Sequence, residues 1–96
     1  MDARETAERH GGFVVAGNMQ SVMADFASPE ALQAFAAQGK TPPRPTTAYE
    51  IVNQSGSDTN PVFDIKYSND HESLTVRSTW GKQGDEWKIV SADAVS

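Results

Sequence analysis

Hydrophobic and polar side chains alternate along most of the C-terminal half of the chain. Between Glu72 and Val95, two such runs flank the pair Gln83-Gly84. A period of two predicts strands with one covered face, and a glycine at the midpoint can supply the positive φ of a tight hairpin turn. We expect Trp80 to pair with Trp87 as cross-strand aromatics. In this register the apolar face of the hairpin carries Leu74, Val76, Ser78, Trp80, Trp87, Ile89, Ser91 and Asp93.

Two more strands precede this hairpin. In the first strand Tyr49 and Ile51 alternate with Glu50 and Val52, and in the second Phe63, Ile65 and Tyr67 alternate with Asp64 and Lys66. A turn at Asn69-Asp70 predicts that Tyr67 pairs with Glu72, which places the bulky groups of both hairpins on one face. The pattern therefore predicts a four-stranded antiparallel meander with one apolar side.

The N-terminal half has helical spacing instead. Residues 2–16 predict one helix, and Gly17-Asn18 is typical of a helix stop followed by the N-cap of another. The second helix carries an apolar side at positions i, i+3, i+4 and i+7, formed by Met19, Val22, Met23 and Phe26. For the two methionines we favour ordinary core over a pliable ligand-binding wall.

A third helix is predicted from Ser28-Pro29-Glu30, where serine can cap, proline fits the first position and glutamate suits the helix dipole. Leu32, Phe35 and Ala36 form its predicted buried stripe. The prolines of residues 41–45 predict a stiff crossing segment. Three helices followed by an antiparallel sheet indicate a single α+β domain over residues 1–96, with the helices packed on one sheet face.

Composition excludes several classes of function. The chain has 96 residues, of which 38% are hydrophobic and 22% charged, as expected of one small globular domain. It lacks cysteine, which excludes disulfides and thiolate chemistry. A net charge of −5 with scattered cations disfavours nucleic acid as a partner. Without a long apolar run or a secretory signal at the start, we expect a cytoplasmic protein and no membrane.

Metal and cofactor motifs are missing from the pattern as well. Neither His10 nor His71 has a second His or Cys at ligand spacing, and the glycines lie at helix ends and turns. We therefore predict no metal and no cofactor.

Two stretches resemble a known family. Residues 13–27, FVVAGNMQSVMADFA, and the closing LTVRSTWGKQGDEWKIVSADAV are similar to segments of the nuclear transport factor 2-like superfamily. Its cone-shaped, cystatin-like roll is shared by ketosteroid isomerases, polyketide cyclases and scytalone dehydratase. Members usually carry a short strand pair between the second and third helices. Here only Ala27 and Ser28 lie there, which predicts a cone that is open on one side.

The resemblance implies acids inside the cone, and two aspartates are candidates for a catalytic role. Asp93 shares the predicted apolar face, where desolvation suits a carboxyl to acid–base chemistry. Asp25 has apolar neighbours, but we favour a solvated carboxylate at a helix end. A ligand in the cone would contact Met19, Met23, Phe35, Tyr49, Tyr67, Trp80, Trp87 and Ser91.

Two functions follow as alternatives. Because no acid–base pair is evident, we favour a non-catalytic dimerising or partner-binding module whose cone is filled by its own side chains. The alternative is a protein that binds a small apolar molecule, or an isomerase-, cyclase- or dehydratase-like enzyme. On the outer sheet face, Asp64, Thr75 and Arg77 predict a solvated charge ladder. Apolar residues interrupt this face and predict a homodimer through Val52, Val62, Val90 and Ala92.

Overall fold

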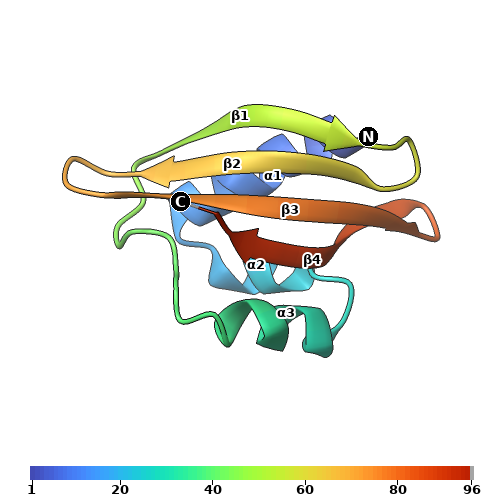
Figure 1. Ribbon diagram of the computed structural model, residues 1–96, viewed down its shortest axis with the longest axis horizontal. Coiled ribbons are helices and arrows are strands. Elements are labelled where there is room, and N and C mark those ends of the chain that lie inside the picture. The colour runs from blue at the N-terminus through green and yellow to red at the C-terminus, as the bar shows by residue number, and fades with distance from the viewer. Residues whose placement is uncertain (96) are drawn as a thin grey trace.

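The computed structural model describes residues 1–95 and confirms the predicted α+β architecture, with three helices on a four-stranded antiparallel meander (Figure 1). The strands lie in the order β1-β2-β3-β4. The elements are α1 (Ala3–Ala16), α2 (Met19–Ala24), α3 (Pro29–Ala36), β1 (Ala48–Gly56), β2 (Pro61–Ser68), β3 (Ser73–Gln83) and β4 (Glu86–Ala94).

Side-chain caps fix where the helices begin. Asp2 and Glu5 form a capping box at the start of α1, and each side chain accepts a hydrogen bond from the other residue's backbone N–H. The predicted caps at Asn18 and Ser28 are confirmed, since each side chain accepts a hydrogen bond from the backbone N–H of the residue three positions later. Gly17 ends α1 with φ of 72°, a conformation that costs glycine little.

A face of small residues lets α1 lie close to the sheet. Ala3 and Ala7 are buried there, and Gly11 lies against the aromatic ring of Tyr49 on β1. A Cβ built on Gly11 would be 2.5 Å from a ring carbon of Tyr49, so no larger residue fits without movement. The close approach of α1 to the sheet at this point therefore depends on glycine at position 11, which has no side chain.

The turn between β2 and β3 is longer than predicted. Asn69 organises it by accepting hydrogen bonds from the N–H groups of His71 and Glu72. Tyr67 consequently pairs with Leu74, rather than with Glu72 as predicted. A shift of two residues preserves the side-chain parity, so Phe63, Ile65 and Tyr67 still face the core together with Leu74 and Val76.

The predicted register of the last hairpin is also wrong. Here the error changes which residues of β4 face the core. Trp80 pairs with Ile89, while Trp87 pairs with Lys82, so the two tryptophans are not cross-strand partners. A β-bulge then inserts Val90 as an extra residue. Beyond it the parity reverses: Ala92 is buried in the core, whereas Ser91 and Asp93 point outward. The bulge keeps a carboxylate out of the apolar interior, where its desolvation would be costly.

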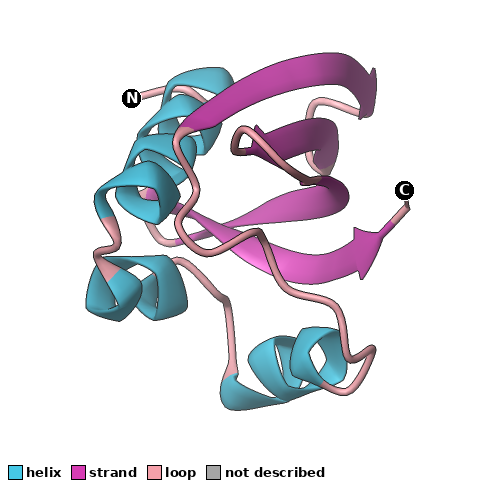
Figure 2. Cartoon of the chain, turned by 90° about the vertical axis from the view of Figure 1, so that its left-hand side faces the viewer, coloured by secondary structure: helices cyan, strands magenta, loops and turns pink. Residues whose placement is uncertain are grey.

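The helices lie on the core side of the sheet but leave it partly open. Figure 2 shows α1 and α2 close together and α3 apart from them, with the linker from α3 crossing back to β1. No residue of α2 or α3 is fully buried. The predicted buried stripe of α3 is only half-buried at Leu32 and Phe35 and is exposed at Ala36.

Backbone hydrogen bonds attach the segment after α2 to β4, an edge strand of the sheet. The N–H of Ile89 donates to the carbonyl of Asp25 at 2.7 Å, and the N–H of Ala27 donates to the carbonyl of Ile89 at 2.8 Å. Farther along β4, the Gln38 side chain donates to the carbonyl of Ala92 and accepts from the N–H of Ala94. The edge is thus covered near the middle of β4 and at its C-terminal end.

Candidate functional site

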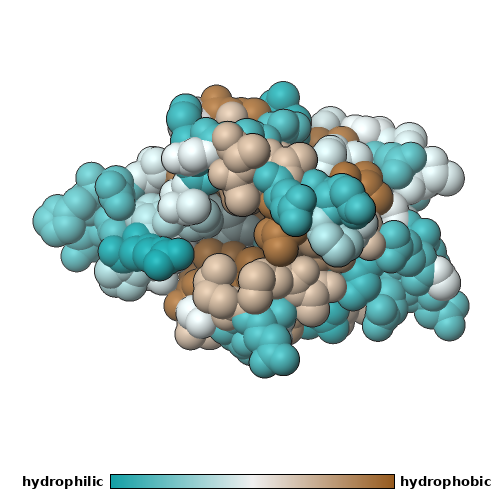
Figure 3. Space-filling view, turned by 90° about the horizontal axis from the view of Figure 1, so that it is seen from below, coloured by the Kyte–Doolittle hydropathy of each residue, from teal (hydrophilic) through white to brown (hydrophobic). Residues whose placement is uncertain are grey.

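The space between the helices and the sheet contains a cavity of about 560 Å³. All three helices, the linker 41–46 and the core faces of β2, β3 and β4 contribute to its wall. In Figure 3, apolar side chains gather around a hollow in the middle of the face, with polar residues at its ends. A volume of this size is typical of small-molecule sites in proteins.

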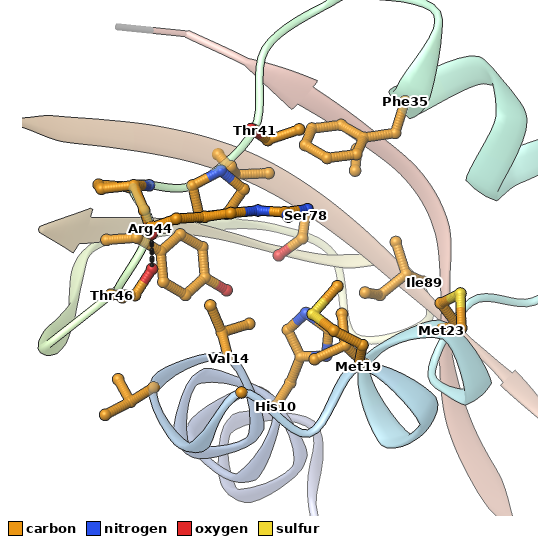
Figure 4. A pocket seen from close by; sticks show the side chains of 18 of the residues that line it. His10, Val14, Met19, Met23, Phe35, Thr41, Arg44, Thr46, Ser78 and Ile89 are labelled. Atoms are coloured by element: carbon orange, nitrogen blue, oxygen red, sulfur yellow. Dashed lines mark hydrogen bonds between the residues drawn. The ribbon is translucent and has the colours of Figure 1, made fainter.

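A buried histidine–aspartate pair lies at one side of the cavity. The Nδ1 atom of His10 is 2.8 Å from Oδ2 of Asp25, and the two residues are 6% and 4% exposed. The edge of the His10 ring also packs against Trp80, with ring centroids 5.8 Å apart and planes at 83°. These contacts hold the imidazole in one orientation, with its ring directed from α1 into the cavity (Figure 4).

The hydrogen bond identifies the proton on the ring. An ionised carboxylate can only accept, so Nδ1 of His10 carries a hydrogen; in the neutral imidazole, Nε2 then has the lone pair. None of the hydrogen bonds among residues 1–95 uses Nε2. Since no buried side-chain nitrogen or oxygen in this part of the chain lacks a partner, Nε2 is accessible, and His10 lines the cavity. The free lone pair is therefore available to a molecule inside it.

Two different helices bring this pair together. His10 lies on the buried side of α1, one or two turns from Ala3, Thr6 and Ala7. Asp25 is the C-cap residue of α2, and its carbonyl accepts from Ile89 of β4, which fixes the backbone beneath the carboxylate. The prediction of a solvated carboxylate at Asp25 is wrong, because the end of α2 turns inward against β4 instead of outward into solvent.

Tyr67 adds a hydroxyl to the cavity wall. Its ring is buried, and the pKa of its hydroxyl is raised by burial, by the negative charge of Asp25 and by Tyr49. The hydroxyl makes no hydrogen bond to residues 1–95 and, by the argument used for Nε2, is accessible from the cavity. Ser78 also lines the wall, but its hydroxyl hydrogen is already used: it donates to the carbonyl of Phe63 and accepts from the indole of Trp80.

The methionines of α2 lie at the cavity and not in the core. Met19 is 50% exposed and Met23 is 48% exposed, and both line the wall. The favoured prediction of ordinary core packing is wrong for both residues, because the described residues 1–95 leave that side of α2 half exposed. Phe35 of α3 lies across the cavity from them (Figure 4). Flexible thioethers around an opening can adapt to ligands of different shape.

The predicted ligand contacts are thus divided by the structure. Four of the side chains line the cavity, namely Met19, Met23, Phe35 and Tyr67. Four others do not: Tyr49 packs beside α1, Trp80 lies behind His10, Trp87 contacts Lys82 at the end of the sheet, and Ser91 is on the outer face. The predicted inward position of Asp93 is wrong, since it pairs with Arg77 across the outer face.

On that outer face, Asp64 and Arg77 of the predicted charge ladder form a two-point ion pair, but Asp64 is buried and not solvated as predicted. Arg77 donates to both carboxylate oxygens of Asp64, at 2.9 and 3.1 Å. These hydrogen bonds hold the pKa of Asp64 below its usual value, even though burial acts in the opposite direction. Of the four valine and alanine positions predicted for a dimer contact, Ala92 is in the core and only Val52, Val62 and Val90 remain available.

Sequence reasoning missed His10 as a site residue, although a signal was present. Ala3, Thr6, Ala7, His10 and Gly11 recur at the spacing of one helix face, which places the imidazole inward. What the spacing cannot give is the partner, because Asp25 lies fifteen positions away and on another helix.

Within residues 1–95, no group of three His, Asp or Glu side chains is arranged to hold a metal ion. In the same range, none of the helices has the length and apolar character needed to cross a membrane.

Comparison with known proteins adds no relative. No family model matches the chain, and neither a curated protein nor a solved structure matches it.

Proposed function

We propose that the chain binds a small, largely apolar molecule in the cavity and transfers a proton on it through His10, in the manner of a nuclear transport factor 2-like isomerase, cyclase or dehydratase. The observation that carries the proposal is the buried pair of His10 and Asp25, with Nε2 accessible from an apolar cavity of about 560 Å³. A neutral imidazole held by a carboxylate is a common arrangement for a general base near neutral pH.

The chemistry follows from the roles of the three polar groups. Nε2 of His10 removes a proton from a carbon next to a carbonyl, and the C–H electron pair moves into an enolate. Asp25 stabilises the imidazolium that forms, without taking the proton itself. The Tyr67 hydroxyl can donate a hydrogen bond to the enolate oxygen. Return of the proton to the same or another carbon completes an exchange or an isomerisation.

A direct test is hydrogen exchange on simple ketones in deuterium oxide. Neutral apolar ketones are first ranked by thermal stabilisation, since a ligand at about 100 times its Kd adds about 2.7 kcal/mol. Deuterium uptake next to the carbonyl is then followed by NMR. His10→Gln should keep the binding and lose about 100-fold or more of the exchange rate. His71→Gln, at the exposed turn after β2, is the matched control and should retain the exchange.

The two halves of the proposal fail separately. If no ketone changes the melting temperature or the tryptophan fluorescence, the cavity is not a binding site for this class of molecule. If ketones bind but His10→Gln exchanges as fast as the wild type, the imidazole is not the base.

Pairing of two copies through the outer sheet face is a second candidate. Its support is the exposure of Val52 and Val90, which lie at the β-bulges of β1 and β4. Sedimentation equilibrium of the wild type and of Val90→Lys tests it: a dimer that the substitution does not weaken would not use this face.

A further inference from the structure

A single formal positive charge lines the cavity, and it belongs to Arg44 in the linker. Apart from His10, the remaining lining residues are uncharged at neutral pH, and no carboxylate of residues 1–95 is among them. The whole chain, by contrast, has 13 acidic and 8 basic residues. Because Asp25 lies behind His10 and does not itself line the cavity, the guanidinium makes the side of the cavity at Arg44 locally attractive to an anion in a protein that otherwise repels one.

Short hydrogen bonds anchor the backbone on both sides of Arg44. The Thr46 hydroxyl donates to the carbonyl of Pro43 at 2.6 Å, and the Asn69 side chain donates to the carbonyl of Pro45 at 3.0 Å. The flanking prolines restrict φ further. From this fixed segment the Arg44 side chain extends across the cavity (Figure 4). A charge on a preorganised backbone loses less entropy when it binds a ligand.

The guanidinium of Arg44 differs from the other arginines in having no partner within residues 1–95. Arg4 contacts Gln54 and Glu8, Arg9 lies over the ring of Phe13, and Arg77 binds Asp64. None of the ion pairs or side-chain hydrogen bonds in the described part of the chain involves the Arg44 guanidinium. Its donors are therefore free for a ligand group.

We propose that Arg44 binds the anionic end of the ligand, so that the ligands of this cavity are apolar carboxylic acids. The inference rests on the proposed function, because it takes the cavity as the binding site. One planar guanidinium matches the geometry and the single charge of a carboxylate. A phosphate monoester carries nearly two charges, and part of that charge would be unpaired in a cavity with no second permanent cation.

The same contact orients the ligand. Arg44 comes from the linker and His10 from α1, on opposite sides of the cavity in Figure 4. Asp25, behind His10, carries a negative charge that repels a second carboxylate on its side. The acid group therefore stays beside Arg44, and the apolar body extends toward Nε2. An acid with a carbonyl group along its chain would present the reacting carbon to the base.

The experiment compares ligands that differ only in their charged end. Dissociation constants of decanoate, decanol and decyl phosphate are measured by calorimetry for the wild type and for Arg44→Gln, with naphthoate and naphthylmethanol as a second pair of different shape. Arg44→Gln should weaken the two carboxylates by about tenfold, the scale of a charge-assisted hydrogen bond at an exposed site. The alcohols should be unaffected. Added salt should reduce the carboxylate affinity of the wild type only.

Lys40→Gln is the matched control, because Lys40 is in the same connection after α3 and does not line the cavity. It should change no affinity. If Lys40→Gln and Arg44→Gln lose carboxylate affinity equally, the effect comes from the overall charge of the protein and not from a contact with Arg44, and the inference is overturned. If the alcohols bind and the carboxylates do not, the inference fails while the proposed function stands; if neither class binds, both fail. Decyl phosphate that binds tighter than decanoate through Arg44 would overturn the assignment of the carboxylate.

Discussion

The contact between Gly11 and Tyr49 allows the packing of α1 on the sheet to be tested quantitatively. A methyl group added at Gly11 would lie 2.5, 2.7 and 2.8 Å from three ring atoms of Tyr49, well inside the 3.4–4 Å of ordinary van der Waals contact. At Gly12, the next residue of the same helix, nothing lies within 4 Å of the added carbon. Both substitutions to alanine gain about 1 kcal/mol of helix propensity. Their difference therefore isolates the clash.

Overpacking of this kind typically costs about 1–3 kcal/mol. Gly12→Ala should be more stable than the wild type by up to about 1 kcal/mol, and Gly11→Ala should be less stable than Gly12→Ala by about 1–3 kcal/mol. Urea unfolding followed by tryptophan fluorescence measures both. With an m value of about 1 kcal/mol/M, the two midpoints should differ by about 1–3 M. Displacement of α1 would also move His10, so any ligand binding of the kind proposed for the cavity should weaken in Gly11→Ala and not in Gly12→Ala.

A double-mutant cycle assigns the clash to its cause. In a Tyr49→Ala background the ring is gone, and Gly11→Ala and Gly12→Ala should then have similar effects on stability. The reasoning is refuted if Gly11→Ala unfolds at the same urea concentration as Gly12→Ala, or at a higher one, with Tyr49 present.

Two further predictions concern pH. The lowered pKa of Asp64 means that its pairing with Arg77 stabilises the fold above the ordinary value of 3.8 and is lost as pH falls through the lower folded-state value. Asp64→Asn should therefore unfold at lower urea than the wild type near neutral pH, with a difference that disappears in acid; a constant difference would contradict the pairing. Tyr49 and Tyr67 both have pKa values raised above 10.0, chiefly by burial. Phenolate absorbance should therefore rise at a higher pH in the native protein than in urea, and identical titration curves in the two conditions would contradict the burial of Tyr67.

The fold was predictable where the pattern is local. Alternation along β2 and β3 identified the core face even though the register with β3 was displaced by two residues, because parity survives an even shift. The caps at Asn18 and Ser28 follow from side chains that reach only three residues ahead. Each of these features depends on neighbours in the chain, which the pattern contains.

The candidate site was less predictable because it depends on distant contacts. The extra residue at Val90 reverses the face of Ser91 and Asp93, and nothing in the alternation of β4 marks it. Without the bulge, the Asp93 carboxylate would be buried under the helices, which is costly. That cost exists only in the folded protein, where the helices cover the sheet, so the local pattern does not contain it. Likewise, His10 and Asp25 became a pair only when the end of α2 was attached to β4.

The backbone bonds between Asp25, Ala27 and Ile89 serve two purposes at once. They hold the carboxylate beneath His10, and they occupy amide and carbonyl groups that an edge strand would otherwise offer to the strand of another molecule. Together with Gln38, they occupy part of the hydrogen-bonding edge that a neighbouring copy would need in order to extend the sheet at β4. Any change that frees the end of α2 would therefore separate Asp25 from His10 and expose hydrogen-bonding groups of an edge strand in the same step.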